Sequence, residues 1–134
     1  MKFAYVDTSC LVAIIFGEEP ARGVAKRLRA YDRLFSSNLL EAELRATFER
    51  EQVEQDAAEE PLSWVTWVYP NRPLTLEMAR VLAMGYLRGA DLWHLACGLF
   101  LESDPRQLHF LTLDERQAEI ASSLNFPGLW GRSE

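Results

Sequence analysis

The chain has 134 residues, of which 49% are hydrophobic and 25% are charged. These proportions are typical of one globular domain over residues 1–134 and exclude collagen-like, coiled-coil and disordered classes. Fourteen Lys and Arg against 20 Asp and Glu give a net charge of −6. This charge argues against a protein held to nucleic acid by its overall charge, but it allows an acidic enzyme whose carboxylates bind cations.

Hydropathy and cysteine usage indicate the compartment. The longest uninterrupted apolar run, Cys10–Phe16, is far shorter than the roughly 20 residues that cross a bilayer, so we expect no membrane span and no membrane partner. Cys10 and Cys97 each lie in an apolar helical stretch, which is typical of buried thiols rather than of a disulfide or ligand pair. We therefore expect a cytoplasmic protein.

Strand-like and helix-like apolar patterns alternate along the chain, which predicts an α/β fold with a mostly parallel central sheet flanked by helices. We predict strands at residues 2–6, 33–36 and 109–113. Helices are predicted between and after them, at residues 10–16, 20–31, 38–55, 60–67, 75–88, 91–102 and 114–124. Residues suited to N-caps precede several of the helices: Thr8 or Ser9, Ser37 or Asn38, and Thr75.

Four acidic residues lie in unusual local settings. Asp7 and Asp114 each end an apolar strand, and Asp91 lies in the first turn of a helix. Glu43 shares a helix face with Leu40 and Thr47, the face expected to meet the sheet. Because the carboxyl ends of parallel strands share one edge, where ligands bind, we expect these carboxylates to converge.

Converging carboxylates repel one another unless cations neutralise them. Hard oxygen ligands without His or Cys favour Mg²⁺ or Mn²⁺ over Zn²⁺. Such ions activate water and stabilise the leaving oxygen in phosphodiester hydrolysis. The pattern therefore predicts a metal-dependent hydrolase.

Simpler interpretations stay open at this point. Asp91 and Asp114 each suit an N-cap, and Glu41 could face inward in place of Glu43. If all four carboxylates were caps and surface groups, the protein would have no affinity for Mg²⁺. A phosphatase of the haloacid dehalogenase type needs a second Asp two residues after the first, where this chain has Ser9.

Four segments in order resemble the motifs of PIN domains, and more narrowly those of VapC-type toxins of bacterial and archaeal toxin–antitoxin pairs: Y-V-D-T-S (5–9), S-N-L-L-E-A-E-L (37–44), A-D-L-W-H-L-A (90–96) and L-T-L-D (111–114). The resemblance spans Tyr5 to about Phe126. It implies a three-layer fold with an acidic pocket at the strand ends and a ribonuclease that depends on Mg²⁺ or Mn²⁺.

The resemblance also implies the role of each site residue. It assigns catalysis and metal binding to Asp7, Glu43, Asp91 and Asp114, with Ser37 selecting Glu43 over Glu41. It assigns supporting hydroxyls to Thr8, Ser9 and Thr112. For His94 we expect a packing or hydrogen-bonding role rather than direct catalysis, and Glu115 leaves a fifth acidic position open.

The partners implied by the resemblance are an RNA substrate, a cognate antitoxin whose segment blocks the acidic pocket, and a second copy in a homodimer. The alternative is a catalytically inactive PIN-like module that binds proteins or regulates. Retention of all four acids argues against that alternative, because a degenerate pocket is expected to lose some of them.

Overall fold

Four parallel strands form the centre of the fold in a computed structural model that describes residues 1–17 and 21–128. The strands lie in the order β3-β2-β1-β4. Their bounds are Phe3–Val6 for β1, Arg33–Ser37 for β2, Val65–Val68 for β3 and His109–Leu111 for β4. The α/β class and the parallel sheet predicted from the sequence are confirmed.

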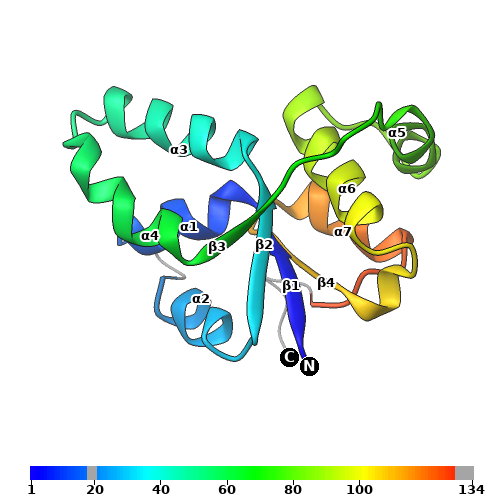
Figure 1. Cartoon of the computed structure of the whole chain (residues 1–134), viewed down its shortest axis with the longest axis horizontal. Helices are drawn as coiled ribbons and strands as arrows, with labels where there is room; N and C mark the ends of the chain where they lie inside the picture. The colour runs from blue at the N-terminus through cyan, green and yellow to red at the C-terminus, as the bar shows by residue number, and fades with distance from the viewer. Residues whose placement is uncertain (18–20, 129–134) are drawn as a thin grey trace.

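Helices cover both faces of the sheet (Figure 1). One layer holds α1 (Thr8–Ile15), α2 (Ala21–Leu28), α3 (Leu39–Arg50) and α4 (Glu59–Ser63). The other layer holds α5 (Thr75–Leu82), α6 (Gly89–Leu101) and α7 (Glu115–Ser123). Two short 3₁₀ turns, Gln55–Ala58 and Pro105–Gln107, complete the described elements.

Alternation along β1 explains why both faces are buried. Ala4 and Val6 pack with the layer that contains α1 to α4, whereas Tyr5 packs with α6 and α7. Successive side chains of a strand point to opposite faces, so one short strand contributes to both hydrophobic clusters. Such two-sided burial is typical of parallel sheets and explains the nearly continuous apolar sequence of 3–6.

One predicted helix was wrong, because the segment 60–67 contains two elements. The helix α4 ends at Ser63, and Val65–Val68 forms the edge strand β3, which pairs in parallel with β2. Val65, Thr66 and Trp67 are β-branched or aromatic, and such side chains fit a pleated, half-buried surface. Pairing with β2 therefore overrode the helical spacing of the segment.

Several predicted helix ends differ from those observed. The helix predicted to reach residue 55 ends at Arg50, because Gln52 adopts a left-handed φ of 59°. The amides of Gln52 and Val53 then donate to the carbonyls of Glu49 and Phe48, which is a Schellman end.

Other boundaries also shift. The helix predicted over 75–88 ends at Leu82, and the helix predicted from Asp91 begins at Gly89. Leu74, rather than Thr75, is the N-cap of α5, and no side chain caps it. The predicted start of α2 at Pro20 lies outside the described residues.

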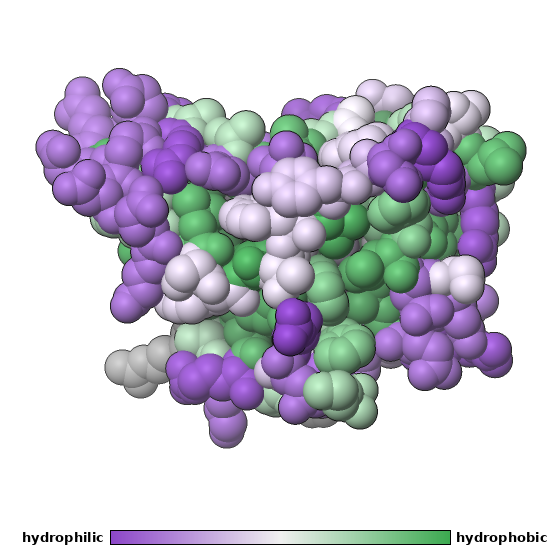
Figure 2. Space-filling model, viewed as in Figure 1, coloured by the Kyte–Doolittle hydropathy of each residue, from purple (hydrophilic) through white to green (hydrophobic). Residues whose placement is uncertain are grey.

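The two cysteines are free and buried, as predicted. Within the described ranges, no helix is long and apolar enough to cross a membrane. Hydrophilic residues cover the outer sides of α3 and α4, and apolar residues reach the surface near α5 (Figure 2).

Candidate active site

The site begins where β1 ends. Asp7 follows β1 directly, and its backbone amide donates to the Leu111 carbonyl of β4 at 2.9 Å. Asp7, and not Thr8 or Ser9 as predicted, is the N-cap of α1, because its side chain accepts from the Ser9 amide. The sequence allowed Thr8 or Ser9 as the N-cap. The carboxylate of Asp7, which precedes both at the end of the strand, accepts from the Ser9 amide instead.

One oxygen of Asp7 is held by hydrogen bonds and the other is not. Asp7 Oδ2 accepts from the hydroxyls of Ser9 at 2.8 Å and Thr112 at 3.1 Å. Asp7 Oδ1 lies 3.8 Å from His94 Nε2. The side chain is buried, so Ser9 and Thr112 hold it with Oδ1 remaining for another partner. Two of the three hydroxyls predicted to support the site, Ser9 and Thr112, thus contact Asp7 directly.

Glu43 reaches the same point from α3. Its Oε1 accepts from Thr8 Oγ1 at 2.7 Å and lies 2.8 Å from His94 Nε2. Burial raises the pKa of Glu43, but the hydrogen bonds from His94 and Thr8 outweigh burial and hold the pKa below its ordinary value. Glu41, the alternative left open by the sequence, instead pairs with Arg45 at 2.8 Å on the outer side of α3.

Asp114 arrives from β4. It is the N-cap of α7, because its Oδ1 accepts from the Gln117 amide at 2.8 Å. Thr112 links this corner to β1, since its hydroxyl accepts from the Asp114 amide and donates to Asp7. The capping interpretation of Asp114 is thus correct, and it leaves Oδ2 outside the cap.

Asp91 completes the group from the first turn of α6. Burial raises the pKa of Asp91 above its ordinary value, and nearby negative charges raise it further. Those charges belong to Asp7, Asp114 and Glu43, and Arg88 offsets them only in part. Neither side-chain oxygen of Asp91 has a hydrogen-bond partner within residues 1–17 and 21–128. The structure therefore brings all four predicted carboxylates into one electrostatic neighbourhood.

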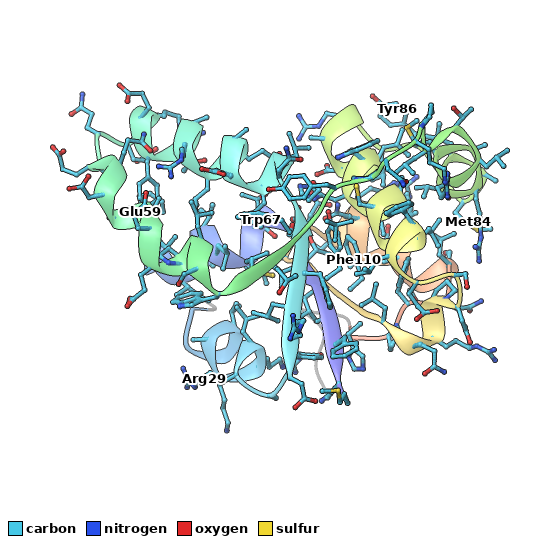
Figure 3. The ribbon with its side chains drawn as sticks, viewed as in Figure 1. Arg29, Glu59, Trp67, Met84, Tyr86 and Phe110 are labelled. Atoms are coloured by element: carbon cyan, nitrogen blue, oxygen red, sulfur yellow. The ribbon has the colours of Figure 1, made fainter. Side chains whose placement is uncertain are left out.

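These four residues come from separate elements that meet at the carboxyl ends of the strands. The helices α3 and α6 diverge above this edge of the sheet, one from each layer (Figure 1). A cavity of about 660 Å³ lies elsewhere, at the start of β2 and β3 beside α2, where Arg29 is labelled (Figure 3). None of the four carboxylates lines that cavity.

The donor set suits a hydrated divalent cation. In the part of the chain that the structure describes, no group of three His, Cys, Asp or Glu side chains already encloses a point that could hold a metal ion. Mg²⁺, however, keeps several of its waters and binds proteins through one or two carboxylates, so direct closure by three side chains is not required. Among residues 1–17 and 21–128, the site oxygens without a hydrogen-bond partner are Asp7 Oδ1, Glu43 Oε2, Asp114 Oδ2 and both of Asp91.

A buried acceptor beside the carboxylates also fits this interpretation. Gln117 Nε2 donates to the Asp91 carbonyl at 3.2 Å, whereas the buried Gln117 Oε1 has no hydrogen-bond partner among the described residues. Buried acceptors normally find a donor, which includes ordered water. Sequence reasoning missed Gln117, although its position three residues after a capping Asp is a known helix-start pattern.

The family of the chain follows from its sequence as a whole. The PIN domain family matches residues 4–123, which include all four carboxylates. The chain belongs to the PIN domain family. Comparison with curated proteins found no match.

PIN domains are generally nucleases, and this PIN domain has the parallel sheet and flanking helices of that fold. The resemblance noted from the sequence is thereby confirmed for the family. Its four motifs lie in the matched region, and each of them delivers one of the carboxylates described above.

Proposed function

We propose that this PIN domain is an endoribonuclease that depends on Mg²⁺ or Mn²⁺. The observation that carries the proposal is that Asp7, Glu43, Asp91 and Asp114 come from separate elements to one edge of the sheet. There the charges of Asp7, Asp114 and Glu43 lie close enough to Asp91 to raise its pKa, in addition to the effect of burial. Folding tolerates such crowding of like charge at functional sites, where a ligand of opposite charge relieves it. A divalent cation is that ligand for a set of carboxylate oxygens.

Four residues would hold the ion, directly or through water: Asp7, Glu43, Asp91 and Asp114. When bound, Mg²⁺ or Mn²⁺ supplies a Lewis acid that activates water and offsets negative charge on the phosphate. Both side-chain oxygens of Asp91 would be available to the ion, since neither has a hydrogen-bond partner among the described residues. Asp7 and Asp114 each offer one oxygen and use the other to fix the start of a helix.

The protein's own residues then orient the RNA. Arg88 is exposed and lies just before Asp91, close enough for its charge to lower the pKa of that residue. Its guanidinium suits a phosphate group next to the scissile bond, because Arg donates two parallel hydrogen bonds to such groups. With a net charge of −6, the protein depends on such local contacts and on the bound cation rather than on overall attraction.

The motif resemblance supports the narrower role of a VapC-type toxin, which a cognate antitoxin inhibits at the acidic pocket. It also supports a homodimer. Large apolar side chains are exposed on and after α5: Leu76, Leu82, Met84 and Tyr86. A second copy that packs on this face would remove them from water. Two buried free thiols suit the reducing cytoplasm in which such a toxin acts.

Cleavage of a labelled single-stranded RNA, with DNA of the same sequence beside it, tests the activity. We expect cleavage of the RNA with Mg²⁺ or Mn²⁺, none with a chelator, and none by Asp7→Asn or Asp91→Asn. Glu41→Gln is the matched control, because Glu41 lies on α3 near Glu43 but pairs with Arg45 away from the site. Its activity should equal that of the wild type.

Other outcomes would change the conclusion. Cleavage that persists in chelator, or in both Asp variants, would contradict the proposal. Saturable Mn²⁺ binding without cleavage of any RNA would favour the alternative of an inactive binding module. Growth arrest on expression of the wild type, absent for Asp7→Asn, tests the toxin role, and light scattering after gel filtration tests the dimer.

A further inference from the structure

A buried chain of hydrogen bonds runs from the sheet to Glu43. Tyr5 Oη lies 2.7 Å from His94 Nδ1, and His94 Nε2 lies 2.8 Å from Glu43 Oε1. Tyr5 and His94 are fully buried. The Tyr5 ring stacks on Phe110 with centroids 5.2 Å apart, on the side of the sheet that α6 covers (Figure 3). The imidazole thus connects β1, α6 and α3 at one point.

The donors in this chain can be assigned from its two ends. Burial raises the pKa of Tyr5, so the phenol keeps its hydrogen. The Tyr5 oxygen accepts from the Ser37 amide at 3.0 Å, and its own hydrogen can be donated to His94 Nδ1, which lies 2.7 Å away. At the other end, the Glu43 carboxylate requires a donor. Because a carboxylate oxygen only accepts, the hydrogen bond to Glu43 places a hydrogen on His94 Nε2, and Nδ1 as an acceptor then matches the Tyr5 hydroxyl.

The consequence falls on the two oxygens of Glu43. Thr8 and His94 both bond to Oε1. Their bonds fix the rotation of the carboxylate, because one oxygen is held from two directions. The second oxygen, Oε2, has no hydrogen-bond partner among the described residues.

We propose that His94 is a positioning residue, which with Thr8 holds Oε1 of Glu43 so that Oε2 faces the cation site, and that Tyr5 fixes the imidazole tautomer this requires. The inference rests on the proposed function, since the cation site gives the positioning its purpose. Groups behind metal ligands act in this way, by orienting a ligand that they do not replace. A role for His94 in packing alone makes different predictions about tautomer and rescue.

The first test is the tautomer itself, measured by long-range ¹H–¹⁵N correlation of the imidazoles in metal-free protein. The chain has only two histidines, and the other one provides a matched pair. His109 Nδ1 lies 2.7 Å from the Tyr31 hydroxyl, the same distance as in the Tyr5–His94 pair, but Glu43 is not its partner. We expect the Nε2–H form for His94, lost or mixed in Tyr5→Phe and unchanged in Tyr31→Phe.

The second test is Mn²⁺ titration by calorimetry. His94→Phe removes the donor and should weaken binding about tenfold, which is typical when a group that orients a ligand is lost. His94→Gln keeps an N–H donor and should restore most of the affinity. Added to the wild type, Tyr5→Phe should weaken Mn²⁺ binding. Added to His94→Gln, it should weaken Mn²⁺ binding much less, because an amide has no tautomer to fix.

The outcomes separate this inference from the proposed function. An imidazole whose hydrogen is on Nδ1 alone, or equal Mn²⁺ affinity of the wild type and His94→Phe, would overturn the positioning role while the metal site stands. No Mn²⁺ binding by the wild type would overturn the proposed function and with it the purpose of His94. If His94→Phe does not fold, Tyr5→Phe decides, since it keeps the ring that stacks on Phe110.

Discussion

Asp7 caps α1 and, in the proposed function, also binds the cation; two substitutions separate these roles. Asp7→Asn removes the charge but keeps an oxygen that can accept from the Ser9 amide and from the hydroxyls of Ser9 and Thr112. Asp7→Ala removes the charge and the acceptor together. The difference in unfolding free energy between the two variants therefore isolates the hydrogen bonds, because the charge is absent from both.

The size of that difference follows from the contacts. Loss of the N-cap costs about 1 kcal/mol. Loss of the acceptor for each of the two buried or half-buried hydroxyls costs about 0.5–1.5 kcal/mol. We therefore expect Asp7→Ala to be about 2–4 kcal/mol less stable than Asp7→Asn, measured by urea denaturation in chelator.

Repeating the denaturation with Mg²⁺ tests the metal. A concentration of 100 times the dissociation constant stabilises a protein by about 2.7 kcal/mol. We expect this stabilisation in the wild type and not in Asp7→Asn. Asp104→Asn is the matched control, because Asp104 also caps a helical turn but lies outside the carboxylate group.

Two results would refute this reasoning. Equal destabilisation by Asn and Ala would show that the charge of Asp7, rather than its hydrogen bonds, holds the start of α1. Equal stabilisation by Mg²⁺ of the wild type and Asp7→Asn would show that Asp7 does not contribute to cation binding.

Three further predictions concern stability alone. In metal-free protein, Asp91→Asn should be more stable than the wild type at neutral pH and lose that advantage in acid. The pKa of Asp91 is raised in the folded protein. The stabilisation that Asp91 gives to the folded state is therefore complete below its unfolded pKa of about 3.9 and is lost as pH rises through its folded pKa. A difference in denaturation midpoint between the two proteins that does not change with pH would contradict this. Phe110→Ala should lose about 3–5 kcal/mol in urea denaturation, because a fully buried ring stacked on Tyr5 leaves a cavity; a loss below about 1 kcal/mol would mean that the core refills. Gln52→Gly should gain up to about 1 kcal/mol in a thermal melt, since glycine adopts the left-handed φ of 59° without strain, and a lower melting temperature would contradict it.

The capping and site interpretations of the carboxylates are compatible in this structure. Asp7 Oδ2 and Asp114 Oδ1 hold the first turns of α1 and α7, and the remaining oxygen of each lies outside those bonds. Glu43 follows the same pattern with Thr8 and His94 in place of a helix amide. One oxygen of each of these groups is held by hydrogen bonds within the fold, and the other has no hydrogen-bond partner among the described residues.

The sequence by itself determined the class of fold and the four acidic candidates. The strand-like runs predicted at 2–6 and 109–113 are long enough to be strands and too short to be helices, and each is followed directly by an Asp. Strand ends in a parallel sheet meet at one edge whatever the side chains are, so Asp7 and Asp114 could be predicted to converge. The positions of these strands, and of the Asp that follows each of them, depend only on residue type and spacing along the chain.

Only the tertiary structure decided what depends on neighbours distant in the chain. The edge strand β3 exists because β2 lies beside it, which no spacing within 60–68 could show. The resemblance implied Glu43 rather than Glu41, but the physical reason is tertiary, because Thr8 and His94 contact Glu43 whereas Arg45 pairs with Glu41. The same is true of Tyr5 and His94, whose hydrogen bond joins residues 89 positions apart. Packing brings such groups together, because hydrogen bonds and charge interactions act over a few ångströms and carry no signature in the local sequence.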